Sequence, residues 1–148
     1  MSEPTLTFKA LESAEKDQCF DWDAMQTQIG FNEQGLVPAI AQQYDSGEVL
    51  MLAWMNRDAL AETLQTGRVC YWSRSRQKLW RKGESSGQVQ VLKSLRLDCD
   101  GDALLLIVDQ TGPACHTGRK SCFYTEVQGD QARILSDPLI DPKDLYRQ

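Results

Sequence analysis

The chain has 148 residues, enough for one domain with a sizeable core, and its 41% hydrophobic and 25% charged residues are ordinary for a globular protein. No hydrophobic run is long enough to span a membrane, and the polar, mixed-charge residues 1–17 resemble neither a signal peptide nor a transit peptide. We therefore expect a cytoplasmic protein that binds no membrane. In that compartment the five cysteines would be metal ligands or core residues and not a disulfide framework.

The net charge of −5 conceals one basic segment. Between residues 68 and 83 the chain has no acid and six cations, which are Arg68, Arg74, Arg76, Lys78, Arg81 and Lys82. An acidic protein with one short basic segment is expected to bind a small anion or phosphate there, and we do not expect it to bind nucleic acid.

The first half of the chain predicts an extension, a β-hairpin and a helix. Residues 1–30 are polar and weakly patterned, with one short helix expected around residues 17–28. Two apolar runs, 36–44 and 49–55, flank a turn sequence and predict the hairpin, and the second run predicts a strand buried on both faces. Asn56 and Gly67 bracket the helix as its N-cap and its C-terminal glycine. Its expected buried stripe is Ala59, Leu60, Thr63 and Leu64.

The second half predicts further strands at residues 69–73, 89–98, 103–109 and 122–127, followed by a sparsely patterned tail. The expected fold class is α+β and β-rich, with a small mixed or antiparallel sheet or pseudo-barrel and one or two helices. We divide the chain into an N-terminal extension (1–30), a central domain (31–128) and a C-terminal tail (129–148).

The acidic run Asp98-Cys99-Asp100-Gly101-Asp102 interleaves hard oxygen donors with one soft sulfur donor. Carboxylates at alternate positions lie on one face of an extended segment, where three oxygen donors suit Mg²⁺ or Ca²⁺. The run does not fit an EF-hand, because its glycine is in the fourth position and the twelfth position is an aspartate. The alternative interpretation is an ordinary solvated turn between two strands.

Three cysteines predict a second, softer metal site. In a regular strand Cys99 points away from the aspartates and can join Cys115 and Cys122, which flank a polar loop. Three thiolates leave one tetrahedral position open, as in a catalytic zinc site. A cysteine can also be core filler, which is how we interpret Cys19 and Cys70.

His116 is the only histidine of the chain. It is a candidate fourth zinc ligand, but the neighbouring side chains of Cys115 and His116 are expected to point apart. That arrangement favours a catalytic role in proton transfer beside the metal.

The basic segment alternates arginine with serine at residues 73–76 and contains two tryptophans. Arginine forks and hydroxyls can bind phosphate, and an aromatic ring can stack on a purine. The alternatives are a solvated strand face, core packing of Trp72, or binding of single-stranded nucleic acid. Because the tract is short, we favour a small phosphorylated ligand. The candidate contacts are Ser73, Arg74, Ser75, Arg76, Trp80, Lys82 and Glu84.

These motifs occur in one collinear set: Trp72-Ser73-Arg74-Ser75-Arg76, then Asp98-Cys99-Asp100 with Asp102, then Cys115-His116-Thr117-Gly118 with Ser121-Cys122. Together with residues 35–40, 49–56 and 79–87, they resemble the phosphoribosyl-AMP cyclohydrolase family of histidine biosynthesis over roughly residues 31–125. The central domain would then be the cyclohydrolase domain. The resemblance implies an intertwined homodimer whose active sites draw residues from both subunits.

The resemblance also implies the site. Zinc is expected at Cys99, Cys115 and Cys122, magnesium at Asp98, Asp100 and Asp102, and His116 near the zinc. The expected reaction is hydrolytic opening of the N1–C6 bond of 1-(5-phosphoribosyl)-AMP by a zinc-activated water, with magnesium assisting substrate binding. A non-catalytic, zinc-stabilised module that binds phosphate or a nucleotide is the alternative function. A zinc base deaminase is disfavoured because its H-x-E and P-C-x-x-C signature is absent.

Overall fold

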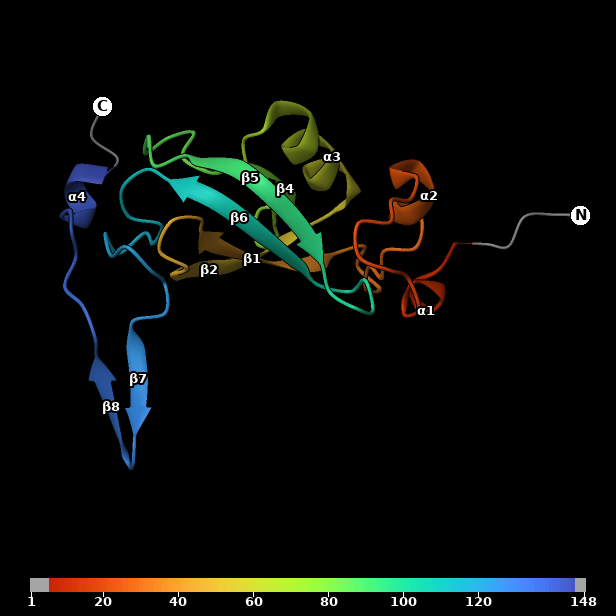
Figure 1. The fold of residues 1–148 in the computed structure, drawn as a ribbon. Coiled ribbons are helices and arrows are strands. Elements are labelled where there is room, and N and C mark those ends of the chain that lie inside the picture. Colours follow the sequence, from red (N-terminus) through yellow and green to blue (C-terminus); the bar gives the residue numbers. More distant parts are fainter. Residues whose placement is uncertain (1–5, 146–148) are drawn as a thin grey trace, which may run out of the picture.

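Residues 6–145 are described in the computed structural model, where a curled sheet is surrounded by short helices and followed by a separate hairpin (Figure 1). The helices are α1 (Phe8–Leu11), α2 (Trp22–Gln26), α3 (Arg57–Thr66) and α4 (Pro142–Leu145). The strands are β1 (Val37–Gln43), β2 (Val49–Met55), β3 (Cys70–Ser73), β4 (Lys78–Arg81), β5 (Gln90–Leu97), β6 (Leu104–Gln110), β7 (Thr125–Gln128) and β8 (Gln131–Ile134). Within this range, none of the helices has the length and hydropathy of a membrane span.

The main sheet has the strand order β4-β3-β2-β1-β6-β5, and only the pair β1 and β6 is parallel. It curls so far that the segment before β3 pairs with the edge strand β5. The Val69 N–H donates to the Gln90 carbonyl at 3.1 Å, and the Leu92 N–H donates to the Gly67 carbonyl at 2.8 Å. The predicted α+β, β-rich class with a mixed sheet is confirmed, and the curl gives the sheet the form of a half-barrel.

The predicted hairpin of β1 and β2 and the predicted helix α3 are confirmed. Asn56 caps α3 by accepting the Ala59 N–H at 2.8 Å, and Gly67 ends the helix with a left-handed φ of +75°. Leu64 was expected in the buried stripe but is 40% exposed. The other three members of that stripe are buried as predicted, and the Thr63 hydroxyl oxygen accepts the Cys70 N–H at 2.9 Å.

The core lies on the concave face of the curled sheet. Alternate residues of β1 and β6 are buried there, including Val37, Ala39, Leu104 and Leu106. The prediction that residues 49–55 are buried on both faces is wrong, because Leu52 on the convex face of β2 is 47% exposed. Apolar residues on that strand therefore exceed what the core of a single chain needs.

Several elements differ from the sequence predictions. The unpredicted elements are α1, α4, β4 and β8. The helix expected at 17–28 is confined to α2, and the last predicted strand begins at residue 125 and not at 122. Met25 and Ile29, from the expected extension, are buried, and Ile29 belongs to the core cluster. The hairpin of β7 and β8 includes residues on both sides of the boundary expected at 128. Residues 1–5 and 146–148 of the expected extension and tail lie outside the described range.

The strand register defines two ends of the half-barrel. Val37 pairs with Met55, and Leu104 pairs with both Ala39 and Leu97, so the loop after β5 lies at the same end as the start of β1. We call this the aspartate end because it holds residues 98–102, near α1 and α2 in Figure 1. The opposite end holds residues 115–122, near the start of β2, and we call it the cysteine end.

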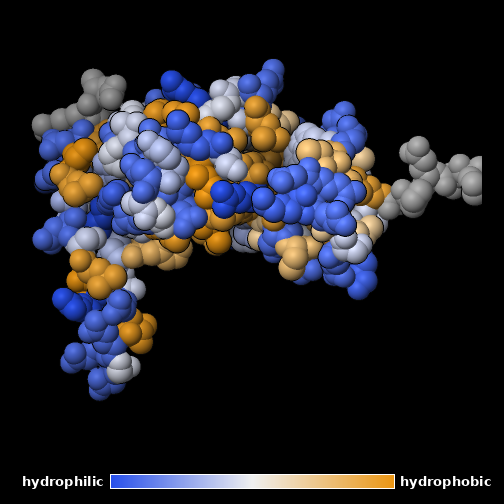
Figure 2. All heavy atoms as spheres, in the orientation of Figure 1, coloured by the Kyte–Doolittle hydropathy of each residue, from blue (hydrophilic) through white to orange (hydrophobic). Residues whose placement is uncertain are grey.

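The hairpin of β7 and β8, residues 125–134, projects from the cysteine end, and we call it the arm (Figure 1). All of its strand residues are exposed. One face carries Thr125, Val127, Ala132 and Ile134, and the other carries polar residues that include the facing pair Glu126 and Arg133. Val127 is 79% exposed, and hydrophobic side chains are visible on the arm in Figure 2. The arm is therefore an amphipathic hairpin whose apolar face is uncovered in the single chain.

Candidate active site

The loop that carries two predicted zinc ligands is attached to the start of β2. The Cys122 N–H donates to the Leu50 carbonyl at 2.7 Å, and the Ser121 hydroxyl donates to the Val49 carbonyl at 2.7 Å. The loop turns tightly at Gly118, whose φ is +86° and where a Cβ atom would collide with the Ile140 carbonyl oxygen. These backbone contacts bring the thiols of Cys115 and Cys122 together.

The two thiols have opposite acidities. Burial raises the pKa of Cys115, but the hydroxyl and backbone N–H of Thr117, the Cys122 thiol and the Arg119 cation outweigh it and leave that pKa below its usual value. The Thr117 hydroxyl donates to the Cys115 sulfur at 3.1 Å. Desolvation and then the Cys115 charge raise the pKa of Cys122 to about 12. The pair therefore holds one negative charge readily and resists a second unless a cation joins it.

Lys82 connects the cysteine pair to the basic segment. Its Nζ donates to the Ala114 carbonyl at 2.7 Å, next to Cys115, and lies 5.6 Å from the centre of the Trp80 ring. Burial lowers the pKa of Lys82, and the negative charges of Cys122 and Cys115 oppose that shift. A partly desolvated cation thus lies between the thiols and the cleft beside them.

A cleft of about 750 Å³ runs along β4 from the β3–β4 turn to residues 83–86, and we call it the basic cleft. It brings together most of the residues predicted to contact substrate: Ser73, Ser75, Arg76, Trp80, Lys82 and Glu84. His116, the predicted catalytic residue, also lines it. The exposed side chain of His116 thus faces an open cleft, while the next residue, Cys115, is only 5% exposed.

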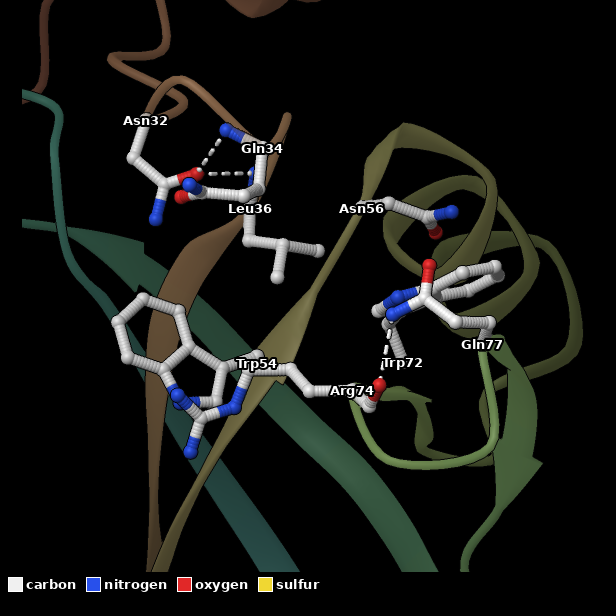
Figure 3. Close-up of a pocket in the computed structure, with 8 residues that line it drawn as sticks. All are labelled: Asn32, Gln34, Leu36, Trp54, Asn56, Trp72, Arg74 and Gln77. Atoms are coloured by element: carbon white, nitrogen blue, oxygen red, sulfur yellow. Dashed lines mark hydrogen bonds between the residues drawn. The ribbon is translucent and has the colours of Figure 1, made fainter.

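Arg74 is the one predicted substrate contact that does not line the basic cleft. It lines a separate cavity of about 440 Å³ with Trp54 and Trp72, at the aspartate end (Figure 3). Arg74 and Arg76 are separated because their side chains point to opposite sides of the β3–β4 turn. The sequence pattern of alternating arginine and serine did not distinguish these two surroundings.

The aspartates at 98, 100 and 102 lie in a turn and not in an extended segment. The expectation of alternate faces is therefore wrong: β5 ends at Leu97, and the Asp102 N–H folds back to donate to Asp98 Oδ1 at 3.1 Å. Gly101 makes the turn possible with a φ of +69°, and a Cβ atom there would collide with the Phe8 ring.

The turn concentrates negative charge. Desolvation raises the pKa of Asp98, but backbone and side-chain hydrogen bonds at Asp102 and the N–H groups of Gly101 and Ala103 hold it below the usual value. The hydrogen bond with Asp98 and then the Asp98 charge raise the pKa of Asp102. The carboxylates repel one another, and a hard divalent cation would relieve that repulsion.

The third predicted zinc ligand is far from the other two. Cys99 lies at the aspartate end beside Leu97 and Phe8, whereas Cys115 and Cys122 lie at the cysteine end. The seven residues of β2 that separate these ends span roughly 20 Å. Within residues 6–145, no three His, Cys, Asp or Glu side chains are placed to hold one metal ion.

Sequence reasoning missed several residues around these sites. Thr117 and the Ala114 carbonyl contact the cysteine pair and Lys82, and Asn32 and Gln77 line the cavity with Arg74. The one available signal was the Cys-His-Thr-Gly run, in which a hydroxyl follows the predicted ligand closely. Asn32 and Gln77 occur in ordinary polar sequence and gave no signal.

Comparisons with known proteins agree with these motifs. A family model described as phosphoribosyl-AMP cyclohydrolase matches residues 51–124, which include all three predicted zinc ligands. A phosphoribosyl-AMP cyclohydrolase of Hydrogenovibrio crunogenus is 67% identical over 97% of both chains. Proteins of that name from Alkalilimnicola ehrlichii and Halorhodospira halophila are 65% and 66% identical, over 95% and 91% of this chain and 99% and 95% of their own lengths. The chain therefore belongs to the phosphoribosyl-AMP cyclohydrolase family.

Proposed function

We propose that this chain opens the N1–C6 bond of 1-(5-phosphoribosyl)-AMP by hydrolysis, as a step of histidine biosynthesis in the cytoplasm. The observation that carries the proposal is that a cysteine pair, the half-buried Lys82 and His116 lie together at one cleft lined by cations. Membership of the phosphoribosyl-AMP cyclohydrolase family supports the proposal.

The donor set at the cysteine end fits zinc. Two thiols lie together, and a hydroxyl and a backbone N–H already stabilise negative charge on Cys115. Zinc bound there would supply Lewis acidity that makes a water nucleophilic near neutral pH. Alkylation at N1 makes C6 of the adenine electrophilic. His116, in the adjacent cleft, takes a proton from the attacking water or delivers one to N1 as the ring opens.

A second copy of the chain supplies the missing thiolate. Cys99 is at the wrong end of its own half-barrel to join Cys115 and Cys122, so a homodimer with shared sites provides the third zinc ligand. The uncovered apolar face of the arm supports this, because two-stranded hairpins alone are marginally stable in water. The exposed apolar residues of β2 also favour burial against another chain.

Magnesium is assigned to Asp98, Asp100 and Asp102. Their crowded carboxylates are the oxygen donors that Mg²⁺ prefers, and Mg²⁺ commonly retains open positions for phosphate. In the basic cleft, Arg76, Lys82, Ser73 and Ser75 contact a substrate phosphate, Trp80 packs against substrate, and Glu84 accepts hydrogen bonds. Arg74 contacts substrate from the neighbouring cavity.

Ring opening of phosphoribosyl-AMP by the purified protein, with and without a chelator, tests the proposal. We expect activity that a chelator abolishes and added Zn²⁺ restores, while circular dichroism shows that the chelated chain stays folded. In the alternative function, a non-catalytic zinc-stabilised phosphate- or nucleotide-binding module, the zinc only stabilises the loop. Unfolding on chelation, with no ring opening by the zinc-loaded protein, would establish that alternative.

A further inference from the structure

The cavity shown in Figure 3 is formed by three segments far apart in the sequence: residues 32–36, 54–56 and 72–77. Its volume of about 440 Å³ lies within the usual range for small-molecule sites, about 300–1,000 Å³. We call it the tryptophan cavity. The basic cleft lies on the other side of the β3–β4 turn and has a different lining, although Ser73 and Arg74 are adjacent in sequence.

The tryptophan cavity is rich in donors and contains no acid. Arg74 places its guanidinium 5.0 Å from the centre of the Trp54 ring, and no ion pair within residues 6–145 involves it. The side-chain oxygen of Asn32, Oδ1, already accepts hydrogen bonds from the backbone N–H groups of Gln34 and Leu36, at 2.9 and 3.0 Å. Its amide nitrogen remains as a donor, and Figure 3 shows that nitrogen pointing into the cavity. This chemistry suits an anionic ligand with a planar ring.

The turn that carries Arg74 is held in a costly conformation. Gln77 has a φ of +53°, which is uncommon for a residue other than glycine. Its backbone N–H donates to the Ser73 carbonyl at 2.8 Å, and its side-chain amide donates to the Arg74 carbonyl at 2.6 Å. The turn thereby directs Arg74 to the tryptophan cavity, and Ser75 and Arg76 to the basic cleft. Such strain occurs preferentially at ligand sites.

The location of the cavity connects it to the reacting centre. Gly30 donates its N–H to the Gly101 carbonyl at 2.8 Å, which joins the aspartate turn to the segment that continues to Asn32. The cavity therefore lies at the same end of the half-barrel as Cys99. In the proposed dimer Cys99 would meet the cysteine end of the partner, so a ligand in the cavity would lie at the same end of the half-barrel as that proposed zinc site.

We propose that the tryptophan cavity binds the AMP half of the substrate, with the purine against the indoles of Trp54 and Trp72 and the 5′-phosphate at Arg74. The inference rests on the proposed function. The substrate has two phosphoribosyl groups, and the β3–β4 turn divides the protein surface into two recognition sites. In the proposed dimer the basic cleft beside the partner's cysteine pair therefore takes the second phosphoribosyl group, the one on N1.

Binding of 5′-AMP, adenosine and ribose 5-phosphate to the zinc-loaded dimer tests the assignment without requiring turnover. Tryptophan fluorescence and calorimetry are the readouts. Arg74→Gln should weaken AMP binding about tenfold or more, as expected when a charge-assisted hydrogen bond is lost, and leave adenosine binding unchanged. Trp54→Leu should weaken AMP and adenosine alike. Arg96→Gln, an exposed arginine on β5, is the matched control and should change neither.

Kinetics separate this inference from the proposed function. Arg74→Gln should raise KM for phosphoribosyl-AMP with little change in kcat, and AMP should inhibit the wild type competitively. AMP binding that neither Arg74→Gln nor Trp54→Leu weakens would overturn the site. Inhibition by AMP that is not competitive would overturn its assignment to the substrate. Absence of ring opening by the wild type would overturn the proposed function, and the AMP titrations would still decide whether the cavity is a nucleotide site.

Discussion

The cysteine end and the aspartate end of the half-barrel hold ligands of opposite hardness in opposite surroundings. At the cysteine end, backbone hydrogen bonds to β2 hold the loop with the thiols, and the half-buried Lys82 lies beside them as a counter-charge. At the aspartate end, a turn at the buried Gly101 concentrates exposed carboxylates that repel one another. Each end therefore suits one class of metal, and in the proposed dimer the single thiol at the aspartate end would join the cysteine pair of the other chain.

A mixture of two cysteine variants tests whether Cys99 of one chain completes the zinc site of the other, and it should give the largest effect. Cys99→Ser and Cys115→Ser should each lose zinc and activity, because each removes one of three thiolates from every site. In a heterodimer of the two variants both lesions fall in one site, and the other site is intact. Random mixing makes half of the dimers heterodimers, so roughly a quarter of wild-type activity should return on co-refolding.

Zinc analysis and the ring-opening assay measure this recovery, and Cys19→Ser, an exposed thiol, is the control that should change neither. No recovery despite proven subunit exchange would show that all three cysteines act within one chain.

His116 tests whether the cysteine end contributes chemistry beyond metal binding. His116→Ala should lower the rate of ring opening about 10²-fold, the usual loss for a general acid or base, and retain its zinc. Metal analysis of the variant decides the role. If the variant releases its zinc, the histidine is a ligand and the proton-transfer role is wrong.

Substitution at the aspartate end should affect only the hard metal. Asp98→Asn should weaken the response of the rate to added Mg²⁺ and leave the zinc content near normal, because the amide removes charge from an oxygen site. Titration of activity against Mg²⁺ measures the change. Asp130→Asn, on the exposed turn of the arm, is a carboxylate control. If Asp98→Asn lost zinc as well as its response to Mg²⁺, the two ends would not bind their metals independently.

Cys70 is a buried thiol that we do not assign to a metal, and its substitution should have the smallest effect, on stability alone. Burial, followed by a hydrogen bond with Glu62, raises the pKa of its thiol to about 12. Since the folded value exceeds the unfolded value of about 8.5, this group contributes stability below that pH and loses the contribution as the pH rises toward the folded value. As the pH is raised from about 8.5 toward the folded pKa of Cys70, the unfolding free energy of Cys70→Ala should therefore fall less than that of the wild type.

Urea unfolding at about pH 7 and about pH 10, with zinc content as a second readout, compares the two proteins. The same change in unfolding free energy for both would contradict the burial argument. Zinc should remain bound in the variant, because Cys70 lies on β3 in the core.

Elements with local signals were predicted correctly from the sequence. Asn56 and Gly67 define α3 through capping, and the turn after residue 44 defines the first hairpin, because these preferences depend on a few neighbouring residues. β4 was missed because it is only four residues long and lines an open cleft, so its sequence, Lys-Leu-Trp-Arg, has no alternating apolar pattern. The burial of β2 was overestimated because periodicity cannot tell which apolar residues another chain covers.

The candidate site shows the same limit. Residue types identified its ligands, but the distance between Cys99 and the cysteine pair follows from long-range strand pairing, which no local pattern encodes. The turn at Gly101 altered the expected faces of the aspartates. The opposite surroundings of Arg74 and Arg76 depend on the left-handed conformation of Gln77, and glutamine gives no sequence signal for that conformation.

The arm has a consequence for how activity responds to dilution. It begins three residues after Cys122, a proposed zinc ligand, and its apolar face is uncovered in the single chain, so we expect a second chain that covers this face to stabilise the segment beside that ligand. In the proposed dimer, pairing of chains, stabilisation of the arm and completion of the metal site would then be one equilibrium governed by mass action. Specific activity should fall as the protein is diluted below its dimer dissociation constant, while each half-barrel, whose core comes from its own strands, remains folded.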